Sequence, residues 1–210
     1  MKEILIIGAG GHAKVLISII KKSKMFHPIG YTDIHDKGLL LGIRYLGKDD
    51  ILEGVIKNKR HFAAAIGLGT VGLDHARIRV FETLERLGFV LPVIVSPQAI
   101  VNEDVKIGMA TVICDGVVVQ PGTSIGRAVI LNTKCSVDHD CEIGDFSHIA
   151  PGAILSGGVR VGKNCLIGTG AAVIQGVRIC ENCVIGAGAT VIDNIDEYGI
   201  YVGSPARKIK

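Results

Sequence analysis

Aromatic residues are scarce in this sequence. Its 210 residues include no tryptophan, five phenylalanines and four tyrosines. Proteins that stack nucleic-acid bases need exposed aromatic side chains, and those that bind the phosphate backbone need clustered lysine and arginine. Lysine and arginine are spread along this chain, and the formal net charge is only +3. We therefore expect no nucleic acid among its partners.

Long hydrophobic runs are also missing. The longest apolar stretch near the start, residues 4–10, is far shorter than the roughly 20 residues of a membrane-spanning helix. It lacks the basic leader and the cleavage site of a secretory signal. Six cysteines are too few for a disulfide scaffold in a chain of this length, and no two C-x-x-C motifs occur at the spacing of a zinc site. These absences predict a cytoplasmic protein without a membrane span and with free thiols.

Residues 1–95 show alternating strand-like and helix-like patterns. Short apolar runs end in glycine or aspartate, and amphipathic stretches separate them. The expected strands are residues 2–8, 27–33, 61–67 and 89–95, and the expected helices are residues 13–22, 49–59 and 73–88. Alternating strands and helices predict a small parallel sheet with right-handed crossovers. We therefore expect residues 1–95 to form a half-sized, Rossmann-like α/β domain.

Residues 99–194 follow a period of six residues instead. In sixteen consecutive hexapeptides, the third letter is always aliphatic and the first letter is always Ala, Val, Thr, Cys or Ser. The third letters are Val101, Ile107, Ile113, Val119, Ile125, Leu131, Val137, Ile143, Ile149, Leu155, Val161, Ile167, Val173, Ile179, Ile185 and Val191. Glycine often follows this letter. A period this short fits one strand and one turn, and such units bury their apolar side chains only by stacking into a solenoid.

This repeat resembles the hexapeptide of left-handed β-helix acyltransferases, in which three hexapeptides form one triangular coil. Sixteen units would give about five coils, ~25 Å tall at the spacing of paired strands. Residues eighteen apart should stack on successive coils, so Cys165 and Cys183 are expected inside the solenoid as packing residues. We therefore expect residues 96–210 to form a left-handed parallel β-helix with a C-terminal cap.

The segment from Gly8 to Ala13 fits the G-x-G-x-x-G/A pattern of a dinucleotide-binding loop, and Asp33 lies at the end of the next expected strand. A dehydrogenase would follow from this pattern. However, residues 1–95 hold too few strands for a full dinucleotide domain, and no substrate domain for hydride transfer follows. Glycines let the backbone approach a ligand, and a helix N-terminus favours an anion. A site for one nucleotide of a nucleotide sugar is the better interpretation, and a strand–helix turn without a ligand is the alternative.

Three separated motifs resemble one family. They are GAGGHAKV near the start, N-T-x-x-x-V-x-H-D at residues 132–140, and VGSPAR at residues 202–207. Together with the short α/β domain and the hexapeptides, their order resembles the sugar acetyltransferases. This family includes UDP-4-amino-sugar N-acetyltransferases of bacillosamine synthesis, GDP-perosamine N-acetyltransferases and sialic acid O-acetyltransferases. The resemblance implies acetyl-CoA as co-substrate, a nucleotide-sugar substrate, and a homotrimer with sites between subunits.

Two histidines lie among carboxylates in residues 136–148. Acetyl transfer needs a base for the attacking amine or hydroxyl, and a carboxylate beside a neutral imidazole fixes its tautomer and stabilises the imidazolium that forms. His139 with Asp140 offers this pair, and the resemblance places the catalytic base at His139. Many relatives have Glu at the position of Asp140, so Asp138 is an alternative partner. A metal site is disfavoured, because His148 lies half a coil from His139 and the two cannot stack on one edge.

The resemblance also assigns the remaining site residues. His148 would lie near the pantetheine or thioester of acetyl-CoA. The residues that match donor-binding positions are His148, Thr169 and Ala187, and those that match substrate-binding positions are Gly10, Gly11, His12, Asp33 and Asn132. The tail would cap the solenoid and bring Arg207 and Lys208 near the phosphates of CoA, unless it is only a solvated basic terminus.

The sequence thus predicts an acetyl-CoA-dependent N-acetyltransferase that acts on a nucleotide-linked amino sugar, first of all a UDP-4-amino-4,6-dideoxy sugar. O-acetylation of sialic acid or another hydroxyl acceptor is the alternative activity. The amine is favoured because the N-terminal loop suits a nucleotide, which free sialic acid lacks. A non-catalytic trimeric scaffold is the alternative of a different class. No metal is expected, because acyl transfer to an amine does not require one.

Overall fold

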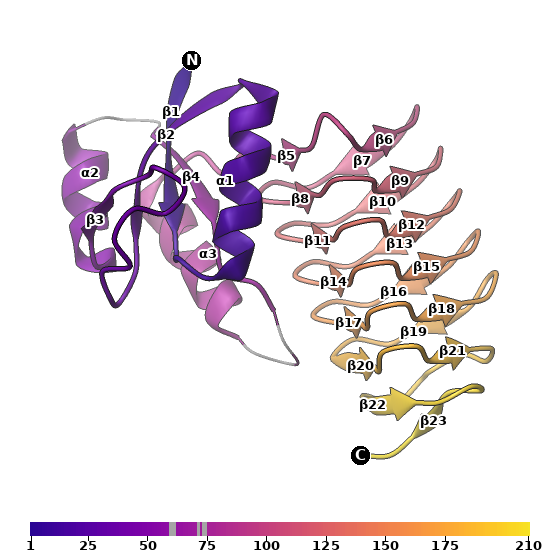
Figure 1. Ribbon diagram of the computed structural model, residues 1–210. Helices are drawn as coiled ribbons and strands as arrows, with labels where there is room; N and C mark the ends of the chain where they lie inside the picture. The colour runs from indigo at the N-terminus through magenta and orange to yellow at the C-terminus, as the bar shows by residue number, and fades with distance from the viewer. Residues whose placement is uncertain (59–61, 71, 73–74) are drawn as a thin grey trace. The chain divides into compact units, whose positions relative to one another are not determined.

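The chain is divided into two compact units in its computed structural model (Figure 1). Unit 1 comprises Met1–Gly69 and His75–Pro97, and unit 2 comprises Thr70–Asp74 and Gln98–Lys210. The structure describes residues 1–58, 62–70, 72 and 75–210. In these residues, no helix is long and apolar enough to cross a membrane.

Unit 1 is built on a parallel sheet with the strand order β3-β2-β1-β4. Each of the four residues from Ile4 to Ile7 on the central strand β1 is at most 1% exposed. A continuous apolar run, rather than an alternating one, is expected for a parallel strand that is covered on both faces. The elements are β1 (Lys2–Ile7), α1 (Gly11–Ser23), β2 (Phe26–Thr32), β3 (Tyr45–Gly47), η1 (Asp49–Ile51), α2 (Leu52–Asn58), β4 (Ala63–Ile66), α3 (Ala76–Leu87) and β5 (Ile94–Val95).

Most expected elements of unit 1 are present with end points shifted by a few residues. The last expected strand, residues 89–95, is wrong in extent: only β5 is a strand, and Val90 forms a single bridge to Ala63. Pro92 lies between them, and proline has no N–H to donate to a strand ladder. Strand β3 was not expected, because its three residues carry no apolar pattern. The expected element ends at residues 59, 61 and 73 lie outside the described residues.

Unit 2 is a left-handed parallel β-helix, as the hexapeptide pattern predicted (Figure 1). Its short strands are β6 (Ile100–Val101), β7 (Lys106–Ile107), β8 (Val112–Ile113), β9 (Val118–Val119), β10 (Ser124–Ile125), β11 (Ile130–Leu131), β12 (Ser136–Val137), β13 (Glu142–Ile143), β14 (His148–Ile149), β15 (Ile154–Leu155), β16 (Arg160–Val161), β17 (Leu166–Ile167), β18 (Ala172–Val173), β19 (Arg178–Ile179), β20 (Cys183–Ile185), β21 (Thr190–Val191), β22 (Gly199–Val202) and β23 (Arg207–Lys208).

Three faces run along the solenoid. The first face contains β8-β11-β14-β17-β20-β22, the second contains β6-β9-β12-β15-β18-β21, and the third contains β7-β10-β13-β16-β19. From β6 to β18, each strand pairs in parallel with the strand eighteen residues later, as Ser136 with Ile154 shows. The chain therefore passes from the first face to the second and then to the third, and it turns a corner between successive faces.

The interior of the solenoid is filled by the first and third letters of the hexapeptides. From Thr111 onward every first letter is buried, and from Ile113 onward every third letter is buried. Cys165 and Cys183 are 2% and 0% exposed, and the pairing of β17 with β20 places them on successive coils. The expected stacking of these two cysteines is confirmed.

Two different constraints shape the turns. The sixth letter has a left-handed backbone in fifteen successive hexapeptides, from Asp104 to Gly188, whether it is glycine or not. The fourth-letter glycines have another cause, because a Cβ on Gly144 would lie 2.6 Å from the carbonyl carbon of Gly162 on the next coil. A glycine at that letter therefore permits close stacking of coils.

The C-terminal tail pairs with the last coil. Strand β22 lies parallel to β20, and β23 returns antiparallel to β22. These strands supply backbone hydrogen-bond partners to the end of the first face, which would otherwise be an open edge.

Candidate active site

His139 and Asp140 form a hydrogen-bonded pair at the corner between β12 and β13. The imidazole Nδ1 of His139 lies 2.8 Å from Oδ2 of Asp140. Asp138 contacts the same residue differently, because its Oδ1 accepts a 2.8 Å hydrogen bond from the backbone N–H of His139. Of the two acids considered from the sequence, Asp140 therefore contacts the ring. The short aspartate side chain reaches the ring because Asp140 occupies a left-handed turn position, with φ of +58°.

The pair has the electrostatics of a general base. The hydrogen bond that Asp140 accepts from the ring, supported by the negative charges of Asp138 and Asp140, raises the pKa of His139 above its ordinary value, against a smaller effect of desolvation. When Nδ1 carries the proton that Asp140 accepts, Nε2 is left as the basic atom. The side chain of His139 is 56% exposed, so a substrate can approach this atom.

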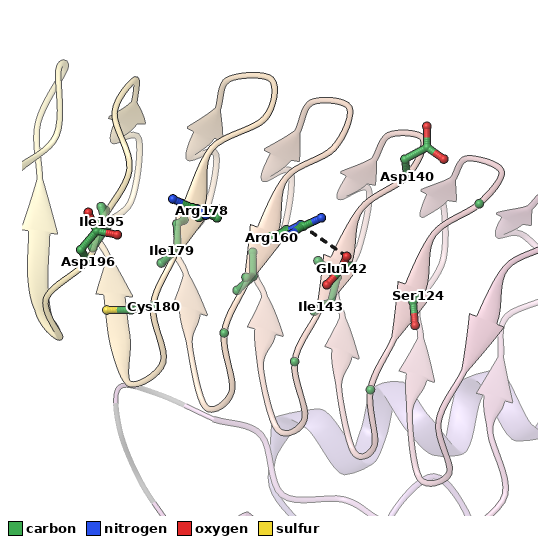
Figure 2. A pocket seen from close by; sticks show the side chains of 15 residues that line it. Ser124, Asp140, Glu142, Ile143, Arg160, Arg178, Ile179, Cys180, Ile195 and Asp196 are labelled. Atoms are coloured by element: carbon green, nitrogen blue, oxygen red, sulfur yellow. Dashed lines mark ion pairs between the residues drawn. The ribbon is translucent and has the colours of Figure 1, made fainter.

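A hollow of about 950 Å³ lies along the third face, next to this corner (Figure 2). Asp140 stands at its rim, and Glu142, Arg160 and Arg178 extend from successive strands β13, β16 and β19. Glu142 pairs with Arg160 at 3.3 Å, as the dashed line in Figure 2 shows. The hollow is open to solvent and lined by both signs of charge.

His148 lies on the first face, on strand β14, and is only 8% exposed. Its Nδ1 lies 3.0 Å from the carbonyl oxygen of Thr70, and its Nε2 lies 3.0 Å from Nδ2 of Asn132. A carbonyl oxygen can only accept and an amide NH₂ can only donate. These contacts therefore select the tautomer with its proton on Nδ1. The sequence-predicted residues Asn132 and His148 are thus direct neighbours.

Thr169 and Ala187 lie at one corner of the solenoid, between the first and second faces. They follow β17 and β20, are eighteen residues apart, and are both exposed. The backbone N–H of Gly188 donates a 2.8 Å hydrogen bond to the carbonyl oxygen of Thr169. Asn132 lies at the same corner on an earlier coil, after β11.

One chain does not bring all predicted residues of unit 2 together. His139 and Asp140 lie at the corner between the second and third faces, whereas Asn132, Thr169 and Ala187 lie at the corner between the first and second. The strands of the second face separate the two groups. A site that uses both groups would need a second copy of the chain.

The predicted nucleotide site lies at the carboxyl ends of strands β1 and β2 in unit 1. Asp33 follows β2, and its Oδ2 accepts a 2.8 Å hydrogen bond from the backbone N–H of Ala9. Gly10 caps the N-terminus of α1 and Gly11 begins it, and a Cβ on either glycine would meet nothing within 4 Å. His12 follows in the first turn and is half-buried. The space in front of the loop is therefore open to a ligand, at the edge of the sheet where α/β folds bind them.

Sequence reasoning missed the segment at the end of the neighbouring strand β4. Gly67, Leu68 and Gly69 follow this strand, and a Cβ on Gly69 would lie 3.4 Å from Cβ of His12. The buried Arg77 donates hydrogen bonds from Nη1 to the carbonyl oxygens of Ile66 at 3.2 Å and Leu68 at 2.7 Å. A second G-x-G directly after an apolar strand was the signal that could have indicated it.

Cysteine and metal chemistry are limited in the described part of the chain. No group of three histidine, cysteine or acidic side chains there has a geometry that could hold a metal ion. The sequence reasoning gave no role to the single C-x-x-C at Cys180 and Cys183, whose sulfurs lie 3.4 Å apart. Burial, together with the contact with Cys183, raises the pKa of Cys180 to about 11, so this thiol is a poor nucleophile at neutral pH.

The basic tail contacts acids of its own unit. Lys208 Nζ lies 2.9 Å from Glu197, and Arg207 Nη1 lies 3.9 Å from Asp193. Their expected approach to CoA phosphates stays a prediction.

Comparisons with known proteins agree with both halves of the chain. The family described as the PglD N-terminal domain matches residues 3–84, and the hexapeptide repeat of succinyl-transferase matches residues 158–192. GDP-perosamine N-acetyltransferase of Escherichia coli O157:H7 is 35% identical over 117 residues, which are 56% of this chain. The chain spans about half the length of that curated relative, 51%.

Solved structures match along the whole chain. The acetyltransferase domain of PglB from Neisseria gonorrhoeae FA1090 is 34% identical, with 100% of both chains covered and a TM-score of 0.92. The same domain has been solved in complex with acetyl coenzyme A, at 33% identity and 99% coverage of both chains, with a TM-score of 0.91. PerB from Caulobacter crescentus, in complex with CoA and GDP-perosamine, is 29% identical with a TM-score of 0.92, and covers 100% of this chain and 98% of its own. The chain therefore belongs to the family of hexapeptide-repeat acetyltransferases that carry a PglD N-terminal domain.

Proposed function

We propose that this protein is an acetyl-CoA-dependent N-acetyltransferase with His139 as its general base. Its acceptor is the amino group of a nucleotide-linked amino sugar, first of all a UDP-4-amino-4,6-dideoxy sugar. The observation that carries the proposal is the 2.8 Å contact between Nδ1 of His139 and Asp140, which leaves Nε2 as the basic atom of a side chain that is 56% exposed. The relatives that bind CoA and GDP-perosamine support the class of both substrates.

The pair performs one proton transfer. As the sugar nitrogen attacks the thioester carbonyl carbon, Nε2 of His139 accepts the proton that the amine loses, and the C–S bond then breaks. The carboxylate of Asp140 stabilises the imidazolium and keeps the ring oriented. The proton then passes from His139 to the departing thiolate, so the base is restored. A raised pKa makes His139 a stronger base for the amine than a free histidine would be.

The donor is assigned to the first face and its corner. The buried His148 contacts the half-buried Asn132 there, and Thr169 and Ala187 are exposed residues on successive coils. We assign contacts with the pantetheine arm and thioester to His148, and contacts with the acetyl-accepting group to Asn132. Thr169 and Ala187 would contribute main-chain groups, so their side chains matter little.

The nucleotide is assigned to unit 1. Gly10 and Gly11 leave open space at the N-terminus of α1, where backbone N–H groups favour a phosphate. Asp33 holds the loop through Ala9 and has a second oxygen that accepts a hydrogen bond from the backbone N–H of His35. Together with His12, these residues form the proposed nucleotide-sugar site. The free thiols and the proposed use of acetyl-CoA support a cytoplasmic location.

A homotrimer would complete the site. The second face points apolar side chains outward, including Ile100 and Ile154, which are 57% and 52% exposed. The third face instead shows charged residues such as Arg160 and Arg178. If three second faces pack about a threefold axis, the corner with His139 in one copy lies next to the corner with Thr169 in the neighbour. This arrangement joins the two groups that one chain keeps apart.

A thiol-release assay tests the proposal. The protein is given acetyl-CoA with UDP- and GDP-linked 4-amino-4,6-dideoxy sugars, free sialic acid and serine. We expect turnover with a nucleotide-linked amine, and we expect His139→Ala to lower kcat by roughly 10²–10⁴-fold, as loss of a general base does. His27→Ala, which removes an exposed histidine from β2, serves as the matched control. Turnover with sialic acid or serine, but with no nucleotide-linked amine, would contradict the proposal.

A further inference from the structure

The imidazole of His139 lies directly against Gly157 of the next coil. A Cβ built on Gly157 would be 2.5 Å from Nε2, 2.6 Å from Cε1 and 3.1 Å from Cδ2 of His139. The two residues are eighteen positions apart, and the backbone N–H of Gly158 donates a 2.8 Å hydrogen bond to the carbonyl oxygen of His139. The ring therefore occupies the volume that any other side chain at position 157 would take.

The backbone does not require glycine at position 157. Gly157 is not among the glycines with positive φ, whereas its neighbour Gly158 is, at +68°. Gly157 is the fifth letter of its hexapeptide, and this letter is not glycine in any of the other fifteen repeats. The fifth letters are Glu103, Met109, Asp115, Pro121, Arg127, Thr133, His139, Asp145, Pro151, Gly157, Lys163, Thr169, Gln175, Glu181, Ala187 and Asp193. The corner thus accepts many side chains, and its single glycine is opposite the proposed base.

A second glycine lies on the other side of the pair. A Cβ on Gly122, on the preceding coil, would be 2.6 Å from Oδ1 of Asp140. Gly122 has a φ of +75°, so its backbone also favours glycine. Gly122 therefore has two reasons to be glycine, its backbone and its contact with Asp140, whereas Gly157 has only its contact with His139.

We propose that Gly157 is a positioning residue for His139, and this inference rests on the proposed function of that histidine. Because Gly157 has no side chain, the ring can lie against the next coil while Nδ1 stays within 2.8 Å of Asp140. A methyl group at position 157 needs 3.4–4 Å of ordinary contact distance where 2.5 Å is available. The ring must then move by about 1 Å, a displacement that can cost on the order of 10²-fold in rate.

The test is Gly157→Ala, with Gly54→Ala as its matched control. Gly54 in α2 also lacks a positive φ, and a Cβ there meets nothing within 4 Å. We expect Gly157→Ala to lower kcat about 10²-fold and to leave the melting temperature unchanged or slightly raised, because the added methyl restricts the unfolded chain. We expect Gly54→Ala to keep wild-type kcat.

Two further measurements separate positioning from a general structural role. In an NMR titration of labelled histidine, Gly157→Ala should lower the pKa of His139 toward its ordinary value, because the displaced ring loses its bond to Asp140. In the His139→Ala background, Gly157→Ala should cause no further loss of rate, because the residue acts through the ring.

An unchanged kcat together with an unchanged titration of His139 in Gly157→Ala would overturn the inference. An equal loss of rate in the His139→Ala background would also overturn it, because Gly157 would then act on something else. The titration does not depend on acetyl transfer. If His139→Ala keeps full turnover while Gly157→Ala still shifts the imidazole, the proposed base is wrong and the packing relationship stands.

Discussion

Nδ1 of His139 lies 2.8 Å from Oδ2 of Asp140, the next residue in the chain. Adjacent residues on a strand point to opposite faces, so their side chains rarely meet. Here the left-handed backbone of Asp140 turns the carboxylate back toward the ring. The corner of the β-helix thus produces a histidine–carboxylate pair from two consecutive letters of one hexapeptide.

Asp140→Asn is expected to shift the pH dependence of turnover. A general base must be neutral, so kcat/KM rises with pH through the pKa of His139. The hydrogen bond that Asp140 accepts from the ring raises that pKa, and its loss should move the acidic limb of the profile to lower pH. The maximal rate should also fall, by up to about 10²-fold, because the tautomer is no longer fixed. Profiles of kcat/KM from pH 5 to 9 test this. Asp138→Asn is the comparison and should shift the limb less, because Asp138 acts on the ring only through its charge. An acidic limb that stays in place in Asp140→Asn would show that Asp140 does not act on the ring.

Asp145→Asn is expected to destabilise the solenoid. Burial alone would raise the pKa of Asp145, but the backbone N–H of Arg127 at 2.7 Å and its guanidinium at 2.9 Å outweigh burial and lower it. We expect a loss of about 1–2 kcal/mol in the free energy of unfolding at pH 7.

A group with a lowered pKa stabilises the fold above its ordinary pKa, and the contribution is lost as pH falls through the lowered value. The difference between Asp145→Asn and wild type in urea titrations should therefore shrink below about pH 4. Glu142→Gln is the matched control, because the Glu142–Arg160 pair is about 60% exposed on each side and should contribute little. Equal effects of the two variants would contradict this assignment.

Ile154→Glu is expected to dissociate the proposed trimer. Ile154 is 52% exposed on the second face, whose outward strand residues are uncharged, and a carboxylate there would be buried without a partner in the assembly. Light scattering after size-exclusion chromatography should show a change from three chains to one, with loss of turnover. Ser124→Glu places the same charge on the third face and should keep the trimer. A trimer that survives Ile154→Glu but not Ser124→Glu would identify the third face as the interface.

Asp33→Ala is expected to weaken binding of the nucleotide sugar. It removes the oxygen that holds the N–H of Ala9 at 2.8 Å and thereby loosens the glycine loop. A hydrogen bond to a charged group is worth roughly 1.5–3 kcal/mol, so KM for the nucleotide sugar should rise about tenfold or more. KM for acetyl-CoA should not change. The control is Asp36→Ala, which removes an exposed acid that accepts a hydrogen bond from the backbone N–H of Gly38. An equal rise in both Michaelis constants in Asp33→Ala would rule out a local role for Asp33.

Much of the fold could be predicted because its signals are local. A side-chain period of six residues is visible in any short window, and it determines which letters are buried, as Ile143 and Cys141 show at 3% and 0% exposure. The shorter elements of unit 1 carried less signal. Strand β3 has only three residues, and the sequence pattern missed it. Pro92 interrupts the last extended segment, so the strand expected there was too long.

The candidate site was predictable in its residues but not in its contacts. Asn132 and His148 are sixteen positions apart, and no periodic rule says that an amide and an imidazole from neighbouring coils will meet at 3.0 Å. The choice between Asp138 and Asp140 depended on the φ of a single turn residue. The loop at Gly67–Gly69, and the hydrogen bond from Arg77 to its carbonyl oxygen at Leu68, also appeared only in the structure.

The sequence by itself determined a solenoid of six-residue units, because this side-chain period is visible in any short stretch. The eighteen-residue coil and the choice of His139 as the base followed from the resemblance of the motifs to a known family. The tertiary structure decided which atoms face each other across coils. It showed that Asp140 contacts the ring of His139, that the ring fills the space left by Gly157, and that His139 and Thr169 lie at different corners. These relationships depend on backbone dihedral angles and on the closure of each coil, and both are set by packing of the whole solenoid rather than by any local stretch of the chain.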